Sequence, residues 1–366
     1  MSNLVKYTEF DRQMIRRCVE LAKQAWGKTA PNPLVGAVII KDGEVIGEGF
    51  HPGVGQPHAE VFALRAAGDK AAGATIYVSL EPCNHYGKTP PCAAALVAAG
   101  VKKVVVGMVD PNPLVAGGGI KTLEQAGIEV VVGVETALCQ ELNEGFVQRI
   151  VHHRPLGILK YAMTLDGKIA TDSGHSTWVS SESSRQYVHH LRAGCDAVII
   201  GGNTLRRDNP NLTSHDAIAP NPLRVVMTQN LDLPTEAILW DTSVAKTLVV
   251  TQTGANPALR ALLIDRGVEV LELDSLSPKL VMKHLFDRGF LSVLWECGGT
   301  LAASAIADGA IQKVLAFVAP KIVGGISAPS PVGDMNIRSM SDALVLERVS
   351  YQQIGSDLLI TGYLGS

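Results

Sequence analysis

The residues of this sequence best suited to chemistry are a histidine, a glutamate and two cysteines in its first half. They occur as His58-Ala-Glu60, then Pro82-Cys83, then Pro91-Cys92. One imidazole and two thiolates can supply the three protein ligands of a catalytic zinc, which keeps a fourth position for water. A carboxylate two residues after the histidine lies near such a metal and can pass the proton of that water to a leaving amine. The pattern predicts His58, Cys83 and Cys92 as zinc ligands and Glu60 as the catalytic acid–base.

The spacing of the two cysteines departs from the usual pattern. Nucleobase deaminases carry His-x-Glu followed by Pro-Cys-x-x-Cys, whereas eight residues separate Cys83 from Cys92 here. The alternatives are a structural zinc site or no metal at all. A structural site needs a fourth Cys or His, and His51 and His85 are available for that role.

Composition indicates a globular protein of about two domains. The chain has 366 residues, of which 18% are charged and 46% apolar. A formal charge of -3 gives no electrostatic basis for binding nucleic acid, and we expect no membrane span and no signal peptide. The six cysteines do not form a disulfide framework, so we expect a reducing, cytoplasmic location.

The elements that must hold the ligands alternate between helix and strand. Apolar residues recur at helical spacing from Thr8 to Gly27, and an Asp-Gly turn within residues 34–49 predicts a β-hairpin. Further strands are expected at residues 75–80, 101–106 and 128–132, and helices at residues 58–67, 92–99, 119–126 and 135–149. These periods place all three ligands at helix starts, where the helix dipole favours thiolates. We predict that residues 1–150 form a three-layer α/β sandwich around a mixed sheet.

Three more residues of this half are compatible with substrate binding. Asn32 lies between two prolines before the first strand, where its amide can read the donors and acceptors of a heterocycle. A turn asparagine explains it equally well. His85 and Lys88 lie on the loop between the cysteines and can meet a phosphate, although a solvated loop is an equal alternative.

The second half starts after a polar stretch that ends in proline, so we assign residues 151–366 to a second domain. Its pattern predicts an α/β domain that ends in antiparallel edge strands. Gly298 and Gly299 lie between a strand and a helix, a junction where backbone amides can approach a phosphate, although a tight turn is an equal explanation. The cluster is not Gly-x-Gly-x-x-Gly, so a Rossmann site is not predicted. Strands are expected at residues 156–162, 197–200, 224–227, 247–251, 268–271, 291–296, 314–318, 344–351 and 358–364, and helices at 182–193, 258–266, 278–288 and 301–307.

Over nearly its whole length the chain resembles the bifunctional deaminase/reductase family of riboflavin biosynthesis. The resemblance rests on the zinc motifs above, on Pro-Asn-Pro at residues 31–33 and on Asp-Pro-Asn-Pro at residues 110–113. In the second half it rests on motifs within residues 163–168, 202–213 and 296–301. The wide gap between the two cysteines is what this family shows.

The resemblance implies a cytidine-deaminase-like domain followed by a dihydrofolate-reductase-like domain, with Zn2+ and NADPH as cofactors. The first would deaminate 2,5-diamino-6-(5-phosphoribosylamino)pyrimidin-4-one, and the second would reduce the ribosyl group of the product to ribityl. The partner is thus a small phosphorylated pyrimidine rather than nucleic acid or a membrane, and we expect a homo-oligomer. The resemblance implies cofactor contacts at Ala162, Trp178, Thr204, Asp208, Thr228, Gly298, Gly299, Thr300, Leu301, Ala302, Ala303 and Ser304, and substrate contacts at Asn32, Lys160, Ser176, Arg192, Leu212, His215 and Glu296.

Two points of the reductase half stay open. Arg192 is a suitable phosphate clamp. The family has an arginine where this chain has His215, so one expected phosphate contact is replaced, and the affinity of the reductase for its substrate is expected to depend more on pH. Arg206 and Arg207 are both candidates for binding the extra phosphate of NADPH.

The rival functions are a deaminase of another nucleobase or nucleoside with an accessory nucleotide-binding domain, and a zinc-stabilised scaffold.

Overall fold

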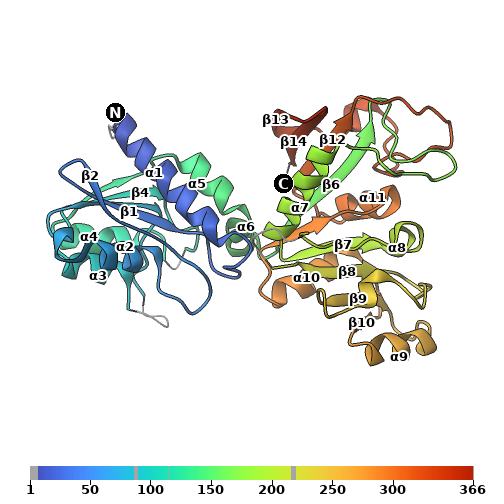
Figure 1. Ribbon diagram of the computed structural model, residues 1–366, viewed down its shortest axis with the longest axis horizontal. Coiled ribbons are helices and arrows are strands. Elements are labelled where there is room, and N and C mark those ends of the chain that lie inside the picture. The colour runs from blue at the N-terminus through green and yellow to red at the C-terminus, as the bar shows by residue number, and fades with distance from the viewer. Residues whose placement is uncertain (1–6, 86–89, 114, 216–219, 366) are drawn as a thin grey trace. The chain divides into compact units, whose positions relative to one another are not determined.

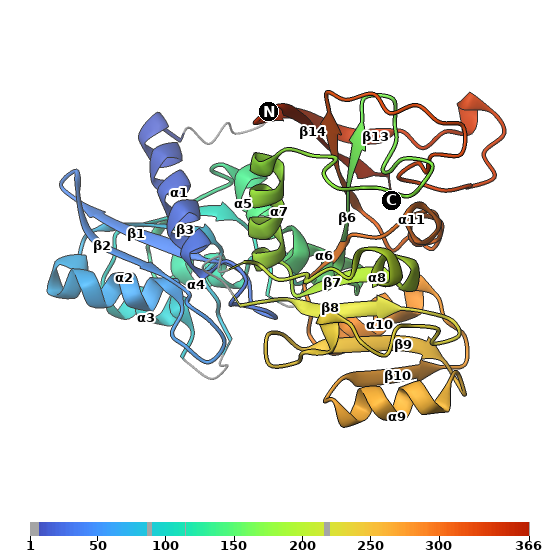
Figure 2. The same ribbon diagram turned by 45° about the vertical axis from the view of Figure 1, so that its right-hand side comes forward.

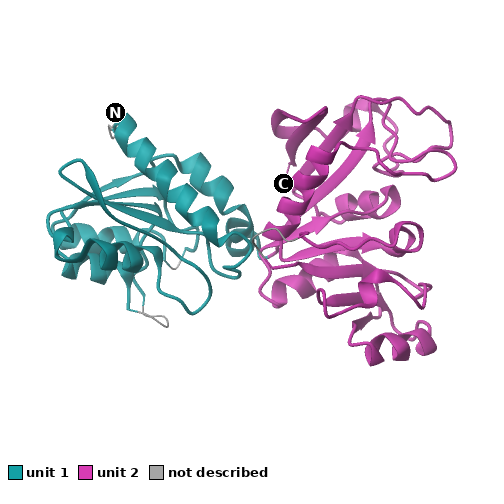
Figure 3. Ribbon diagram, viewed as in Figure 1, with its two compact units in different colours: residues 1–153 teal, residues 154–366 magenta. Residues whose placement is uncertain are grey.

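The computed structural model describes residues 7–85, 90–113, 115–215 and 220–365. The chain divides into two compact units, residues 1–153 and 154–366 (Figure 3). Helix α6 (Glu144–His152) includes the first two residues of the polar stretch, residues 151–155, at which the second domain was expected to start. The expected division after residue 150 therefore falls inside this helix.

Unit 1 is built on a five-stranded sheet with the order β2-β1-β3-β4-β5 (Figure 1). The first three strands in this order are antiparallel, and β3, β4 and β5 are parallel, so the sheet is mixed, as predicted. Val and Ile dominate the central strands, which are buried on both faces. The strands are β1 (Gly36–Lys41), β2 (Glu44–Phe50), β3 (Thr75–Leu80), β4 (Lys103–Met108) and β5 (Glu129–Val132).

Helices cover both faces of this sheet. In both views α1 and α5 lie on one face, and α2, α3 and α4 lie on the other (Figures 1 and 2). This arrangement confirms the predicted three-layer sandwich. The helices are α1 (Glu9–Ala22), which starts with a capping box of Thr8 and Asp11, α2 (Ala59–Ala67), α3 (Cys92–Ala98), α4 (Gly118–Gln125) and α5 (Thr136–Leu142).

The single helix predicted over residues 135–149 is wrong, because α5 and α6 are separate helices that meet at Asn143. The buried amide of Asn143 accepts from the Leu34 N–H at 2.8 Å and donates to the Leu34 carbonyl at 2.9 Å. These two bonds satisfy backbone groups that precede β1. They also fix the segment that carries Asn32.

Unit 2 is built on a nine-stranded sheet with the order β10-β9-β8-β7-β11-β6-β12-β14-β13. The seven strands from β10 to β12 are parallel, and β14 and β13 are antiparallel at one edge, as predicted. The strands are β6 (Leu156–Thr164), β7 (Ala197–Gly201), β8 (Leu223–Met227), β9 (Thr247–Gln252), β10 (Glu269–Leu273), β11 (Ser292–Trp295), β12 (Lys313–Ala319), β13 (Leu346–Ile354) and β14 (Asp357–Leu364).

Alternate residues of the central strands enter two different cores. Val198 and Ile200 of β7 pack with α7 and α9, whereas Ile199 of β7 and Trp295 of β11 pack with α10 and α11. The helices are α7 (Glu182–Gly194), α8 (Gly202–Asp208), α9 (Pro257–Asp265), α10 (Pro278–Asp287) and α11 (Gly299–Ala307). The sequence did not predict α8, because Gly201 and Gly202 resemble the end of a strand more than the start of a helix. In the described part of the chain no helix is long and apolar enough to cross a membrane.

Candidate zinc site and reductase cavity

The three predicted zinc ligands come from the ends of neighbouring elements. His58 is the N-cap of α2, and Cys92 is the first residue of α3. Cys83 does not start a helix, so that part of the prediction is wrong; it lies in the loop between β3 and α3. Its Sγ nevertheless accepts a hydrogen bond from the Cys92 N–H at 3.3 Å, so the positive end of α3 still favours the Cys83 thiolate.

The three ligand atoms form a compact cluster. His58 Nδ1 lies 3.2 Å from Cys92 Sγ and 3.5 Å from Cys83 Sγ, and all three atoms are within 4.8 Å of one another. A tetrahedral zinc with bonds of about 2.0 to 2.3 Å holds its ligand atoms roughly 3.5 to 4 Å apart. Among the residues that the structure describes, no other His, Cys, Asp or Glu joins the cluster. The donor set therefore fits a zinc ion with one open position.

Glu60 lies in the first turn of α2 and is only 3% exposed. Its Oε2 atom is buried without a hydrogen-bond partner, which is unusual for a carboxylate. Burial raises the pKa of the Glu60 carboxyl to about 7. A carboxyl poised near neutrality beside an open metal position is suited to taking a proton from water and giving it up again.

His51 does not serve as a fourth ligand, because both of its ring nitrogens are engaged elsewhere. Nδ1 lies 3.1 Å from the Pro57 carbonyl, and Nε2 lies 3.0 Å from Nδ2 of Asn32. A carbonyl only accepts, so Nδ1 carries the proton, and the neutral ring accepts from the Asn32 amide. Burial lowers the pKa of His51, which favours this neutral form. The pair fixes the orientation of the Asn32 amide.

Glu81 directly precedes the Pro82-Cys83 motif, and the sequence patterns did not predict a role for it. Its carboxylate is 3% exposed and accepts four backbone hydrogen bonds. Oε2 accepts from the N–H groups of Asp110 and Gly117, and Oε1 from those of Gly119 and Ile120, at 3.0 to 3.2 Å. A Cβ atom on Gly119 would lie 1.9 Å from the Pro82 carbonyl, so the start of α4 packs directly on the segment that carries Cys83.

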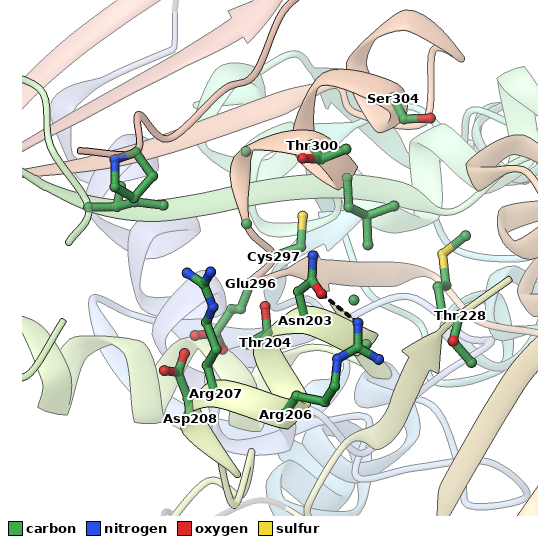
Figure 4. Close-up of a pocket in the computed structure, with 18 of the residues that line it drawn as sticks. Asn203, Thr204, Arg206, Arg207, Asp208, Thr228, Glu296, Cys297, Thr300 and Ser304 are labelled. Carbon is green, nitrogen blue, oxygen red and sulfur yellow. Dashed lines mark hydrogen bonds between the residues drawn. The ribbon is translucent and has the colours of Figure 1, made fainter. Parts of the chain in front are cut away.

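The second unit contains a cavity of about 730 Å³ beside the carboxyl ends of β7, β8 and β11 (Figure 4). This size suits a cofactor-sized ligand. Ala162, Trp178, Ala302 and Ala303 do not line it, whereas the other predicted cofactor contacts do: Thr204, Asp208, Thr228, Gly298, Gly299, Thr300, Leu301 and Ser304. Of the predicted substrate contacts, Ser176 and Glu296 line it.

The junction of β11 and α11 presents backbone amides to this cavity. Gly298 is the N-cap of α11, and a Cβ atom there would meet no atom within 4 Å. Gly299 packs against the chain, since a Cβ there would lie 2.7 Å from the Ser330 carbonyl. The first turn of α11 is thus held in place with Gly298 open to the cavity, an arrangement that suits an anion such as a pyrophosphate.

Three predicted substrate contacts form one buried ionic cluster. Arg192 Nε donates to Glu296 Oε1 at 2.6 Å, and Nη2 donates to Oε2 at 3.0 Å. Lys160 Nζ lies 3.6 Å from the same Oε2. Burial acts to raise the pKa of Glu296, but the charges of Arg192 and then Lys160 outweigh it and lower this pKa to about 2. Arg192 also donates to the Thr213 carbonyl, so three of its five donors are occupied.

His215, which stands at the usual arginine position, stacks on a second histidine. Its ring lies 4.0 Å from that of His189, with an angle of 25° between the planes. Leu212, another predicted substrate contact, is buried in the hydrophobic core that α7 and α9 form with the sheet. Of the two loop residues considered for a phosphate, His85 is exposed, and Lys88 lies outside the described residues.

Comparison with known proteins gives the same division of the chain. Residues 8–108 match the family described as cytidine and deoxycytidylate deaminase zinc-binding region, and residues 155–360 match the family described as RibD C-terminal domain. The riboflavin biosynthesis protein RibD of Synechocystis is 61% identical over 354 residues, which cover 97% of this chain and 96% of that protein. The chain belongs to the RibD family.

Solved structures agree with this assignment. Acinetobacter baumannii RibD is 40% identical, with a TM-score of 0.87 over 98% of this chain and 99% of that chain. A Thermotoga maritima diaminohydroxyphosphoribosylaminopyrimidine deaminase/5-amino-6-(5-phosphoribosylamino)uracil reductase is 34% identical, with a TM-score of 0.84 and the same coverage. Family membership confirms the predicted two-domain α/β fold, the two enzyme activities of riboflavin biosynthesis, and the zinc and NADPH that they use.

We expect Glu81→Gln to weaken zinc binding by about 10- to 100-fold, the usual range for a partner that orients a metal ligand. Glutamine keeps one acceptor oxygen and turns an NH2 group toward two backbone N–H donors, so the support behind Cys83 is lost. Chelator competition on the purified chain measures the effect. Glu129→Gln, which removes the same charge from an exposed site on β5, is the matched control. Equal zinc affinity in both variants would contradict the role assigned to Glu81.

Proposed function

We propose that the protein catalyses two consecutive reactions of riboflavin biosynthesis. The zinc site deaminates 2,5-diamino-6-(5-phosphoribosylamino)pyrimidin-4-one, and the second unit then reduces the ribosyl group of the product to ribityl with NADPH. The observation that carries the proposal is the His58, Cys83 and Cys92 cluster with the unpartnered Glu60 oxygen beside it. The activities named for the Thermotoga maritima relative support the choice of substrate.

In the first reaction the roles of the side chains follow from their positions. His58, Cys83 and Cys92 would hold the zinc ion, and the metal would supply a water whose pKa is lowered toward about 7. Glu60 accepts the proton of this water and returns it to the nitrogen that leaves as ammonia. Asn32, held by His51, offers a fixed amide to the edge of the pyrimidine.

In the second reaction the protein mainly positions its two ligands. NADPH supplies the hydride. The backbone amides at Gly298 would hold the pyrophosphate of the cofactor, and the buried cluster of Lys160, Arg192 and Glu296 would face the substrate with a net charge of one plus. Such a transfer depends on the distance and alignment of the two ligands more than on strong acid catalysis.

A single assay separates this function from a deaminase with an accessory nucleotide-binding domain. The purified chain is given the diaminopyrimidine nucleotide and NADPH, and ammonia release and NADPH loss are followed together. The proposed enzyme releases ammonia and then oxidises NADPH in equal amount. Ammonia without NADPH oxidation would favour the accessory domain, and neither signal would favour a scaffold.

Glu60→Gln should lower the rate of ammonia release by about 100- to 10,000-fold, the usual contribution of a general acid–base group. The zinc ligands are untouched, so the zinc content should stay the same. NADPH oxidation with the deaminated pyrimidine supplied directly should also stay the same, because that reaction occurs in the other unit. Glu44→Gln, at an exposed residue of β2, is the control. Ammonia release near the native rate in Glu60→Gln would exclude this carboxylate from the chemistry.

His215→Arg should flatten the pH dependence of the reductase KM between pH 6 and pH 8. Histidine as a residue type changes charge near neutral pH, whereas arginine does not, so the native chain should bind its phosphorylated substrate several-fold better at pH 6 than at pH 8. Burial, and then the charges of His215 and Arg192, lower the pKa of His189 to about 4, so His189 stays neutral throughout. Glu296 and Arg185 are the other charged groups that act on His189, and neither changes charge in this range. The substrate phosphate titrates equally in both proteins; a pH response that is identical in the two would disprove the role of His215.

We also propose that the protein is a homo-oligomer located in a reducing compartment, the cytoplasm. All six cysteines are free, which suits such a compartment. β13 is an edge strand with an exposed face, and Met340 and Val345 before it are 89% and 79% exposed. Exposed apolar side chains in the segment that leads into an edge strand favour a second copy of the same chain as their partner.

Met340→Glu combined with Val345→Glu should shift the native oligomer toward monomer, because each copy would bury two carboxylates in the interface. Sedimentation velocity at micromolar concentration measures the change. Leu165→Glu, at an exposed apolar residue outside this segment, is the control. A native chain that sediments as a monomer would refute the oligomer.

A further inference from the structure

Two arginines of the short helix α8, Arg206 and Arg207, line the reductase cavity. NADPH differs from NADH only in the phosphate on the 2′-oxygen of its adenosine ribose. A guanidinium is the side chain best matched to such a group, because its planar donors pair with phosphate oxygens. The sequence does not distinguish between the two arginines, but their surroundings do.

The direction of the cofactor in the cavity follows from the order of the strands. The nicotinamide must lie beside the groups that face the substrate, which are Lys160 on β6 and Glu296 after β11. The sheet continues from β6 through β11 and β7 to β8, and the cavity walls include residues that follow each of the last three. With the pyrophosphate at Gly298, the adenosine lies at the β8 end, near Thr228 and the loop that follows it.

Arg206 lies at this β8 end. Its guanidinium donates to the Asp232 carbonyl, in the loop after β8, and to Oδ1 of Asn203. A Cβ atom on Gly202 would be 3.4 Å from Arg206 Nη1 and 3.5 Å from Cβ of Thr228, so the guanidinium lies close to the residue that follows β8. Two of its five donors are occupied, which leaves three for a ligand.

Arg207 points to the other side of the cavity, where Asp208 and Glu296 also lie (Figure 4). Its Nη1 is 3.6 Å from the position of a Cβ atom on Gly174, in the loop that leads to Ser176. Ser176 and Glu296 are predicted substrate contacts. Arg207 therefore lies at the substrate end of the cavity and not at the β8 end, where the adenosine is placed.

We propose that Arg206, and not Arg207, binds the 2′-phosphate of NADPH and is the main determinant of the preference for this cofactor. The exposed carboxylate of Asp232 lies 3.6 Å from Arg206 Nη1 and strengthens the effect. In the native chain the charge of Arg206 balances the charge of this carboxylate. Without Arg206, the carboxylate would repel a 2′-phosphate and accept a hydrogen bond from a free 2′-hydroxyl, as acidic residues do in NAD sites.

The inference rests on the proposed reductase function, and binding measurements separate the two. Calorimetry on the full-length chain gives the Kd of NADPH, NADH, adenosine 2′,5′-bisphosphate and 5′-AMP. Arg206→Gln should weaken the binding of NADPH and of the bisphosphate by about 10- to 100-fold, the range expected for hydrogen bonds to a charged group. The binding of NADH and 5′-AMP should stay the same or improve. Arg206→Lys should keep part of the preference.

Arg207→Gln is the matched control, since it removes the same charge from the next residue of the same helix. It should leave the ratio of the NADPH and NADH affinities within about threefold of the native value, well under one decade in Kd. Binding of 5′-AMP at the native affinity or better shows that the cavity of the second unit is folded in each variant. If Arg207→Gln abolishes the preference and Arg206→Gln does not, the inference is wrong while the reductase function stands. If the native chain binds neither dinucleotide, the proposed function itself fails.

Discussion

The parallel direction of neighbouring strands is the constraint on which both sites depend, because it brings the carboxyl ends of those strands to one edge of each sheet. In the first unit Glu81 and Cys83 follow the end of β3, and Asp110 follows the end of β4. In the second unit Gly202 follows the end of β7, and Glu296 follows the end of β11. Backbone hydrogen bonding within the sheet stops at this edge, so the N–H groups of the following loops and helix starts remain available to anions. Zinc thiolates, carboxylates and phosphates all use such groups.

Glu81 shows that the protein's own carboxylates use many of these available N–H groups. Its carboxylate accepts hydrogen bonds from four N–H groups within residues 110–120. It thereby connects the segment after β3, which carries Cys83, to the segment after β4. The thiolate of Cys83 then takes the N–H of Cys92 at the start of α3. Each hydrogen bond contributes little stability alone, but several donors to one anion together hold it firmly in one position. The ligand cluster is therefore held in position by the backbone around it.

The sequence predicted those features that depend on residue type and on short-range periodicity. The zinc ligands belong to this class, because few arrangements other than a metal site bring His58, Cys83 and Cys92 into such an order. Most strands and helices do too, since Val- and Ile-rich runs and capping residues are local signals. Features with distant partners could not be predicted. Glu81 meets groups 29 to 39 residues away, and Asn143 meets Leu34 at a separation of 109 residues. His51 resembled a spare ligand until the partners of both its ring nitrogens were known.

Two buried glutamates illustrate how the fold assigns different tasks to the same side chain. Glu60 is buried with an oxygen that has no partner, and burial raises its pKa to about 7. Glu296 is buried as well, yet the charges of Arg192 and Lys160 lower its pKa to about 2. The first carboxyl can gain and lose a proton at neutral pH, which hydrolysis with loss of an amine requires. The second remains an anion unless a ligand draws Arg192 or Lys160 away from it. Glu296 therefore holds Arg192 and Lys160 in place as charged groups at the proposed substrate site.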